Sequence, residues 1–251
     1  MNIEAYLKRI NAKTRKISTD IKSLKYLQRQ HLISVPFENL DIHWGKTITL
    51  DVDKFYEKVV DKNRGGFCYE LNGLFNELLK AIGFTTRIVS CRVAKKDGKF
   101  GEEYDHLAIV VNLNGSLYLT DVGFGDFLTE PLLLDIGAEL QDPSGIYRIL
   151  SAGKFLEIQK KTTDGWDSEY KFTNSKQKLE EFAGMCLFNQ TSPESHFTKG
   201  KLCSILTIAG RKTLTDKKFI VLKNGVREET ELKSNGEFNK ILKREFSIVK
   251  E

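Results

Sequence analysis

The dipeptide Asn114-Gly115 constrains the fold of this chain more than any other feature of the sequence, because it lies between two apolar runs. Asn-Gly is the preferred sequence of a two-residue type I′ turn, and it predicts a β-hairpin formed by residues 106–113 and 116–122. Residues 85–93 show the same β-branched, alternating pattern upstream of the hairpin. We therefore expect an antiparallel sheet or barrel to begin at about residue 85.

The turn also fixes the register of the hairpin. If the two residues that flank the turn pair with each other, His106 lies opposite Gly123 and Ala108 lies opposite Asp121. Because side chains alternate along a strand, His106 and Asp121 then project from the same face as diagonal neighbours. The rest of this face is apolar, so the carboxylate would be buried and would need a partner. The pair is either a hydrogen-bonded core pair or part of a catalytic site.

The part of the chain before residue 84 has the period of helices. Apolar residues recur at helical spacing over 52–60 and again over 71–82, and Gly83 supplies a stop after the second run. Later in the chain we expect a helix over 179–188, strands over 202–208 and 218–222, and a closing helix near 238–246.

Cys68 is a candidate nucleophile. It follows Gly65 and Gly66 and stands at the start of the predicted helix, where backbone N–H groups and the helix dipole favour the thiolate. The two glycines allow the close backbone approach that such a turn needs. A histidine can take the proton of the thiol and an aspartate can orient the histidine. The alternative is an inert buried thiol.

The composition excludes several classes of protein. The net charge of +5 arises from 39 basic and 34 acidic residues mixed along the chain, so no concentrated basic face for nucleic acid is expected. We predict a cytoplasmic protein without membrane contact, because no long apolar run and no apolar leader are present and the four cysteines form no disulfide framework. An anionic small-molecule partner fits the mild positive charge.

The remaining histidines and cysteines suggest no further site. We expect His31 and His43 to be solvated or to cap helices, and Cys91, Cys186 and Cys203 to be core residues. The spacing of Cys68, His106 and Asp121 matches no compact zinc motif, so no metal is predicted.

Five motifs in order along the chain resemble those of the bacterial-type arylamine N-acetyltransferase family. They are VPFENLD at 35–41, RGGFCYELNGLF at 64–75, DHLAIVV at 105–111, DVGFG at 121–125 and SPESHF at 192–197.

The resemblance implies an α+β fold with a catalytic core like that of the cysteine proteases. It divides the chain into a helical domain (1–84) that carries the nucleophile, an antiparallel β-barrel domain (85–188) that carries the histidine and aspartate, and an α/β lid domain (189–251). The implied triad is Cys68, His106 and Asp121. The implied reaction transfers an acetyl group from acetyl-CoA through the cysteine to an arylamine, arylhydroxylamine or hydrazine, in two ping-pong steps. The oligomeric state stays open.

The resemblance further implies roles for residues around this triad. Arg64 would pair with Glu38 as scaffolding. Acceptor contacts are implied for Phe37, Val93 and Phe124, and coenzyme A contacts for Gly123, Gly125 and Thr207; core packing and turn geometry are the alternative roles of these six. The chain departs from some relatives at Asp126, where they carry a basic residue. A hydrolase with the same triad, an amide synthase and a non-catalytic binding protein are the competing functions.

Overall fold

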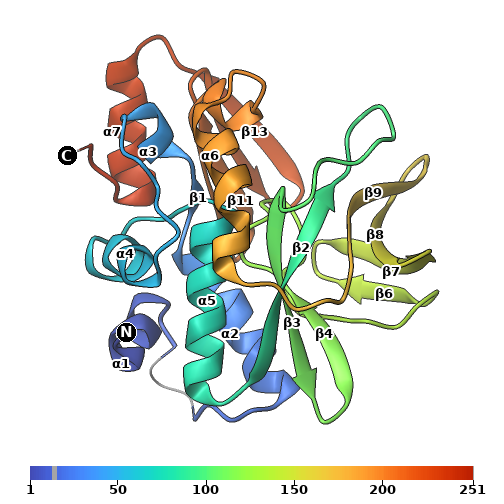
Figure 1. The fold of residues 1–251 in the computed structure, drawn as a ribbon. Coiled ribbons are helices and arrows are strands. Elements are labelled where there is room, and N and C mark those ends of the chain that lie inside the picture. The colour runs from blue at the N-terminus through green and yellow to red at the C-terminus, as the bar shows by residue number, and fades with distance from the viewer. Residues whose placement is uncertain (13–15, 251) are drawn as a thin grey trace.

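The computed structural model describes residues 1–12 and 16–250, so residues 13–15 and 251 of the first and last predicted domains lie outside the described part. The N-terminal part is helical, apart from one short strand. Figure 1 shows these helices packed beside the barrel. The elements are α1 (Ile3–Arg9), α2 (Ile21–Ser34), β1 (Phe37–Glu38), α3 (Leu40–His43), α4 (Val52–Tyr56), the π-helical turn η1 (Glu57–Asp61) and α5 (Cys68–Ile82).

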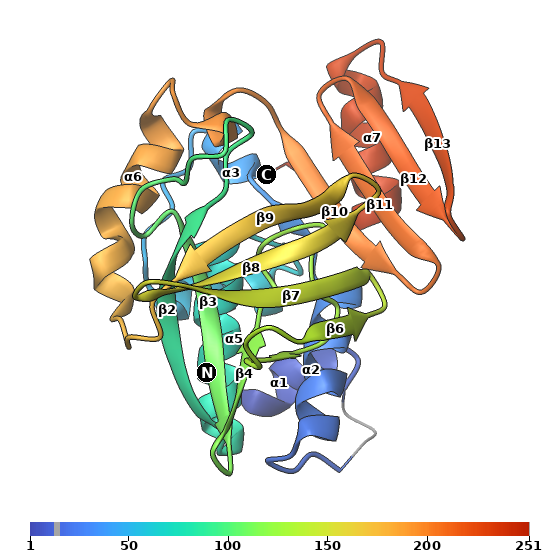
Figure 2. The same ribbon diagram turned by 90° about the vertical axis from the view of Figure 1, so that its right-hand side faces the viewer.

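The central part is an antiparallel sheet that curls into a nearly closed barrel (Figure 2). Its strands follow the order β5-β4-β3-β2-β9-β8-β7-β6, and the two end strands β5 and β6 approach each other. The strands are β2 (Thr85–Val93), β3 (His106–Leu113), β4 (Ser116–Thr120), β5 (Leu132–Leu133), β6 (Glu139–Asp142), β7 (Gly145–Ala152), β8 (Phe155–Thr162) and β9 (Gly165–Phe172).

The C-terminal part adds a second sheet in the order β1-β10-β11-β12-β13, which α7 covers. Strand β1 therefore ties the N-terminal helices to this sheet, with Phe37 opposite Ser204 and Glu38 opposite Cys203. The elements are the 3-10 turn η2 (Leu179–Phe182), α6 (Ala183–Thr191), the 3-10 turn η3 (His196–Thr198), β10 (Leu202–Thr207), β11 (Gly210–Thr215), β12 (Lys218–Lys223), β13 (Val226–Glu231) and α7 (Asn235–Phe246).

Strand β3 separates two hydrophobic cores. Leu107, Ile109 and Val111 face the helical core around α5, whereas Ala108 and Val110 face the interior of the barrel. Both faces of β3 are thus buried, which explains its nearly continuous apolar sequence. The α+β fold is confirmed, while the three domain boundaries stay a prediction.

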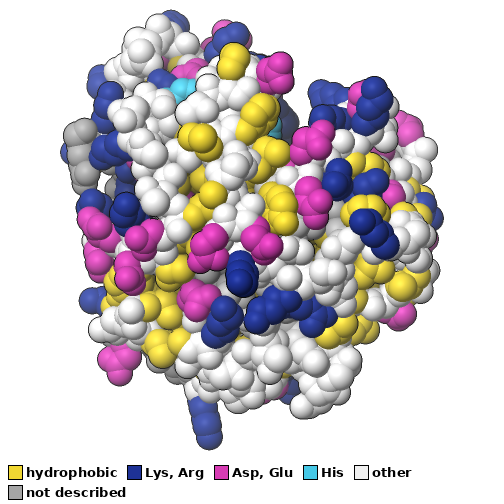
Figure 3. All heavy atoms as spheres, viewed as in Figure 1, with side chains coloured by type: hydrophobic (Ala, Val, Ile, Leu, Met, Phe, Trp, Pro, Cys, Tyr) yellow, Lys and Arg dark blue, Asp and Glu magenta, His cyan; other side chains and the backbone are white. Residues whose placement is uncertain are grey.

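The predicted hairpin has the expected turn and register. Asn114 and Gly115 both have positive φ, as a type I′ turn requires, and Leu113 pairs with Ser116. Residues 52–60, expected to form one helix, instead form α4 followed by the π-helical turn η1. Charges of both signs are spread over the face of the molecule in Figure 3.

Candidate active site

Two glycines allow the chain to turn tightly into α5, whose first residue is Cys68. A Cβ atom on Gly65 would lie 1.9 Å from the carbonyl oxygen of Pro36, and one on Gly66 would lie 2.8 Å from the side chain of Glu70. Neither site has room for a side chain, and the predicted close backbone approach is confirmed at Gly65, whereas the close neighbour of Gly66 is a side chain. Gly83 ends the helix in the left-handed conformation, also as predicted.

His106 and Asp121 form the predicted pair. His106 Nε2 donates a hydrogen bond to Asp121 Oδ2 at 2.7 Å, and each residue is only 2% exposed. Since Nε2 is occupied by this bond, Nδ1 is the ring nitrogen that remains to accept a proton. The ring is further held between Phe124 and Tyr170, at 4.9 and 5.4 Å between ring centroids.

Both carboxylate oxygens of Asp121 accept hydrogen bonds. Its Oδ1 accepts hydrogen bonds from Asn72 Nδ2 at 2.8 Å and from the Gly123 amide at 2.9 Å, and its Oδ2 also accepts one from the Tyr170 hydroxyl at 3.1 Å. These donors compensate the buried charge, so the carboxylate can orient the imidazole without a counterion from solvent.

Asn72 and Tyr170 are site residues that the sequence did not reveal. Asn72 lies four residues after Cys68 on α5, and this spacing on one helix face is a signal that could have identified it. It joins the helix to the barrel, because its amide also donates to Leu107 O at 2.6 Å and accepts from the Val122 amide at 2.8 Å. Tyr170 comes from the distant strand β9, and no local pattern predicts its position.

One apolar cavity of about 380 Å³ brings most of the predicted site residues together. Cys68 and His106 line this catalytic cavity, and so do Phe37, Val93, Gly123, Phe124 and Gly125. Its remaining lining residues are Asp105, Asp126, His196, Phe197, Leu202, Ser204, Arg211 and Thr213.

Thr207 does not line the catalytic cavity. It lies in an adjacent hollow of about 390 Å³, which shares Asp126 and Arg211 with the catalytic cavity. Arg211 supplies a basic group beside Asp126, with its Nε 3.5 Å from Asp126 Oδ1 and its Nη2 donating to Gly125 O at 2.8 Å. An acid therefore stands at position 126, with a base opposite it on β11.

Gly123 has a structural reason to be glycine. A Cβ atom at this position would lie 2.8 Å from the Cα atom of Cys68 and 2.9 Å from Nδ2 of Asn72. The strand-to-loop turn after Asp121 therefore packs directly against the start of α5, and any side chain at Gly123 would push the two apart.

The surroundings of Cys68 disfavour an isolated thiolate. The residue is 3% exposed, and burial raises the pKa of its thiol well above the ordinary value, with Asp105 acting in the same direction. A hydrogen bond with the backbone of Leu107 lowers the pKa of the Cys68 thiol, but this offsets only part of the rise. A thiolate at this position therefore depends on a nearby proton acceptor, and His106 lines the same cavity.

The predicted pairing of Arg64 with Glu38 is present, with Arg64 Nη2 donating to Glu38 Oε1 at 2.6 Å. The prediction for His31 is wrong, because this ring is fully buried between Tyr6 and Phe75. His43 is half-buried and contacts Phe197 O at 2.9 Å. The other three cysteines, at 91, 186 and 203, are buried as predicted.

Over residues 1–12 and 16–250, no group of three or more His, Cys, Asp or Glu side chains is arranged to hold a metal ion. None of the helices in the described part of the chain combines the length and the apolar composition that crossing a bilayer requires.

Residues 20–251 match the family model described as N-acetyltransferase. The chain is 30% identical to the pineal gland isozyme NAT-10 of arylamine N-acetyltransferase from Gallus gallus, over 100% of this chain and 95% of that protein. The solved structure of arylamine N-acetyltransferase from Salmonella typhimurium superposes with a TM-score of 0.92 at 29% identity, covering 98% and 90% of the two chains. That of the Mycobacterium marinum enzyme in complex with CoA gives 0.90 at 29% identity, covering 98% and 93%.

Proposed function

Because the chain belongs to the arylamine N-acetyltransferase family, we propose that it transfers an acetyl group from acetyl-CoA to the nitrogen of an aromatic amine, hydroxylamine or hydrazine. The observation that carries the proposal is the shared apolar cavity lined by Cys68 and His106, with Asp121 bonded to the far side of the imidazole. This is the constellation of a nucleophile, a base and an orienting acid.

In the first half-reaction, the proton of the Cys68 thiol moves to His106 Nδ1, and the sulfur attacks the thioester carbonyl of acetyl-CoA. The carbon–sulfur bond to CoA breaks, and His106 returns the proton to the departing CoA sulfur. Asp121 stabilises the imidazolium that forms in between. The product is an acetyl-Cys68 thioester and free CoA.

In the second half-reaction, the acceptor nitrogen attacks the acetyl carbon of the thioester. The bond to sulfur breaks, and His106 takes a proton from the nitrogen and gives it to Cys68. The acetylated amine leaves, and the enzyme returns to its first state.

The apolar walls of the catalytic cavity support an aromatic acceptor. We assign acceptor contacts to Phe37, Val93 and Phe124, which line this cavity together with Cys68. For coenzyme A we assign Gly123, Gly125 and Thr207, since the first two line the catalytic cavity and the third lies in the hollow beside it.

Intact-protein mass spectrometry after treatment with acetyl-CoA tests the proposal. Wild-type protein should gain about 42 Da, the mass of an acetyl group that replaces a hydrogen, and Cys68→Ala should gain nothing. In the absence of acceptor, CoA release should be one burst equal to the enzyme concentration. Steady CoA release without an amine would instead identify a hydrolase, and an equal adduct on the Cys68→Ala variant would exclude Cys68 as the nucleophile.

A further inference from the structure

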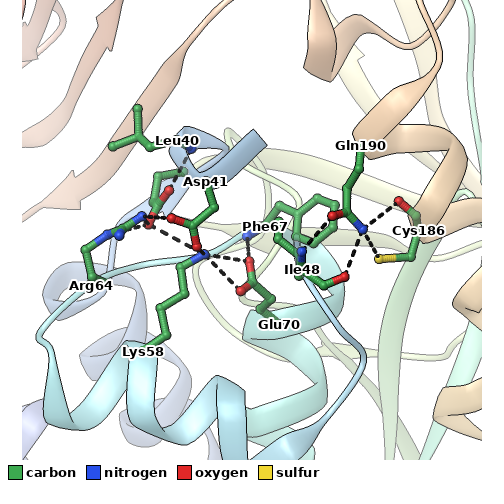
Figure 4. A network of polar contacts seen from close by, with 10 residues as sticks. Leu40, Asp41, Ile48, Lys58, Arg64, Phe67, Glu70, Cys186 and Gln190 are labelled. Carbon is green, nitrogen blue, oxygen red and sulfur yellow. Dashed lines mark hydrogen bonds and ion pairs between the residues drawn. The ribbon is translucent and has the colours of Figure 1, made fainter. Parts of the chain in front are cut away.

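A buried lysine stands at the centre of a charged network beside the start of α5 (Figure 4). Lys58 Nζ lies 2.9 and 3.0 Å from the two carboxylate oxygens of Glu70 and 2.8 Å from Asp41 Oδ2. The third carboxylate, of Glu38, is 3.8 Å away. The catalytic mechanism proposed above does not use any of these four side chains.

The network holds three carboxylates and two cations. Arg64, the second cation, donates to Glu38 and Asp41 but has no contact with Glu70 among those that the structure gives for the described residues. Lys58 is therefore the cation that pairs with Glu70. Burial alone would lower the pKa of Lys58, but the surrounding carboxylates outweigh it and hold the pKa above the ordinary value. For Glu70, burial dominates and raises the pKa, although Lys58 opposes the shift.

Glu70 connects Lys58 to the nucleophile. Its Oε2 accepts a hydrogen bond at 3.0 Å from the backbone N–H of Phe67, the residue directly before Cys68. A glutamate in the first turn that bonds back to the residue before the helix satisfies a backbone donor that has no partner within the helix, and so ties that residue to the first turn. The missing side chain of Gly66 leaves the space that this carboxylate occupies.

The position of Lys58 depends on an irregular turn. Lys58 belongs to η1, where the helix that begins at Val52 widens from α to π geometry. Such widened turns are rare and occur frequently at functional sites. The turn places the lysine in the interior, where its carboxylate partners come from β1, α3 and α5.

We propose that Lys58 is a positioning residue for Cys68: it holds the Glu70 carboxylate against the Phe67 amide and so sets the place of the sulfur in the catalytic cavity. This inference rests on the proposed role of Cys68 as the acetyl-accepting nucleophile. Lys58 itself touches neither substrate nor reacting atoms. Its effect is expected on the rate of Cys68 acetylation and not on the affinity for acetyl-CoA, because Lys58 does not line the catalytic cavity.

The test compares Lys58→Met with a double variant that adds Glu70→Gln. In the single variant Glu70 loses its cation, so its carboxylate either leaves the buried site or becomes protonated, and the restraint on Phe67 is lost. In the double variant the glutamine oxygen can accept from the Phe67 amide without needing a counterion. Lys212→Met is the control, because it removes a lysine of β11 that pairs with Glu245 on α7.

Rapid mixing with acetyl-CoA measures the rate constant of the CoA burst and its dependence on acetyl-CoA concentration. We expect Lys58→Met to lower the limiting rate constant roughly 10- to 100-fold, as a misplacement of about 1 Å does, with little change in the half-saturating concentration. The double variant should return to within about threefold of wild type, and Lys212→Met should match wild type. A residue that only fills the core would give no such recovery.

The outcomes separate this inference from the proposed function. A wild-type protein that releases no burst of CoA overturns the proposed function. A wild-type burst with a Lys58→Met burst of equal rate constant overturns the positioning role. If the single variant does not fold, the double variant decides alone: a rate constant near that of wild type supports the role, and one that is at least tenfold lower overturns it.

Discussion

The buried ring of His31 should make the protein lose stability in mild acid. The imidazole packs between Tyr6 and Phe75, with ring centroids 6.0 and 5.1 Å away, and neither ring nitrogen has a hydrogen-bond partner within residues 1–12 and 16–250. Burial, assisted by the positive charge of Arg9, lowers the pKa of His31 from 6.5 to about 3. The folded protein therefore keeps the ring neutral over a range in which the unfolded chain binds a proton.

The sign and size of the effect follow from this difference in pKa. Below pH 6.5 the unfolded state gains a proton that the folded state does not bind, so the free energy of unfolding falls as the pH is lowered, until the folded pKa of about 3 is reached. Each pH unit in this window costs about 1.4 kcal/mol. Between pH 8 and pH 4.5 the contribution of His31 amounts to about 2.7 kcal/mol.

His31→Phe isolates this contribution, because a phenyl ring can occupy the slot between the two aromatic neighbours and does not titrate. Urea unfolding of wild type and variant, followed by the fluorescence of Trp44 and Trp166, gives the two free energies at each pH. We expect the stability of the variant relative to wild type to rise by about 2.7 kcal/mol from pH 8 to pH 4.5. Tyr6→Phe, which removes a neighbouring buried hydroxyl, should show no such change. An equal difference at both pH values would refute a neutral buried imidazole.

Two further predictions concern the candidate active site. Wild-type Cys68 should react with iodoacetamide well below pH ~8.5, the pKa of a free thiol, because His106 accepts its proton. In His106→Gln, the raised pKa of the buried thiol should move the reaction to strongly alkaline pH. Equal pH profiles of the two proteins would contradict this. Gly123→Ala should lower the burst rate roughly 100-fold, because its Cβ atom would press on Cys68, while Gly184→Ala on α6 meets open space and should retain the wild-type burst.

Local signals explain what the sequence could predict. The Asn114-Gly115 turn specifies both the hairpin and its register, so the approach of His106 to Asp121 could be derived from about twenty consecutive residues. The start of α5 at Cys68 likewise follows from a glycine pair and an apolar helical stripe. Both signals act over short distances along the chain, where the spacing of apolar and turn residues directly determines the backbone conformation.

Other features depend on contacts between distant segments. Strands β6 to β9 have half-exposed, mixed polar sequences, and their alternation is too weak to identify them without their neighbours in the sheet. Tyr170 reaches Asp121 only because β9 pairs with β2. The error on His31 was avoidable, since Leu24, Leu27 and His31 recur at helical spacing and so share one buried face of α2.

The convergence of the three candidate catalytic residues is itself a long-range property. The helix start places Cys68 and the hairpin places His106 and Asp121, but neither local feature brings the two groups together. The helix start and the hairpin meet where Gly123 packs against the backbone of Cys68 and where Asn72 bonds to Leu107 and Asp121. Asn72 therefore fixes the position of α5 relative to the barrel segments that carry His106 and Asp121. Its position four residues after Cys68 means that any rotation of α5 that moves the sulfur also strains the bond that orients Asp121.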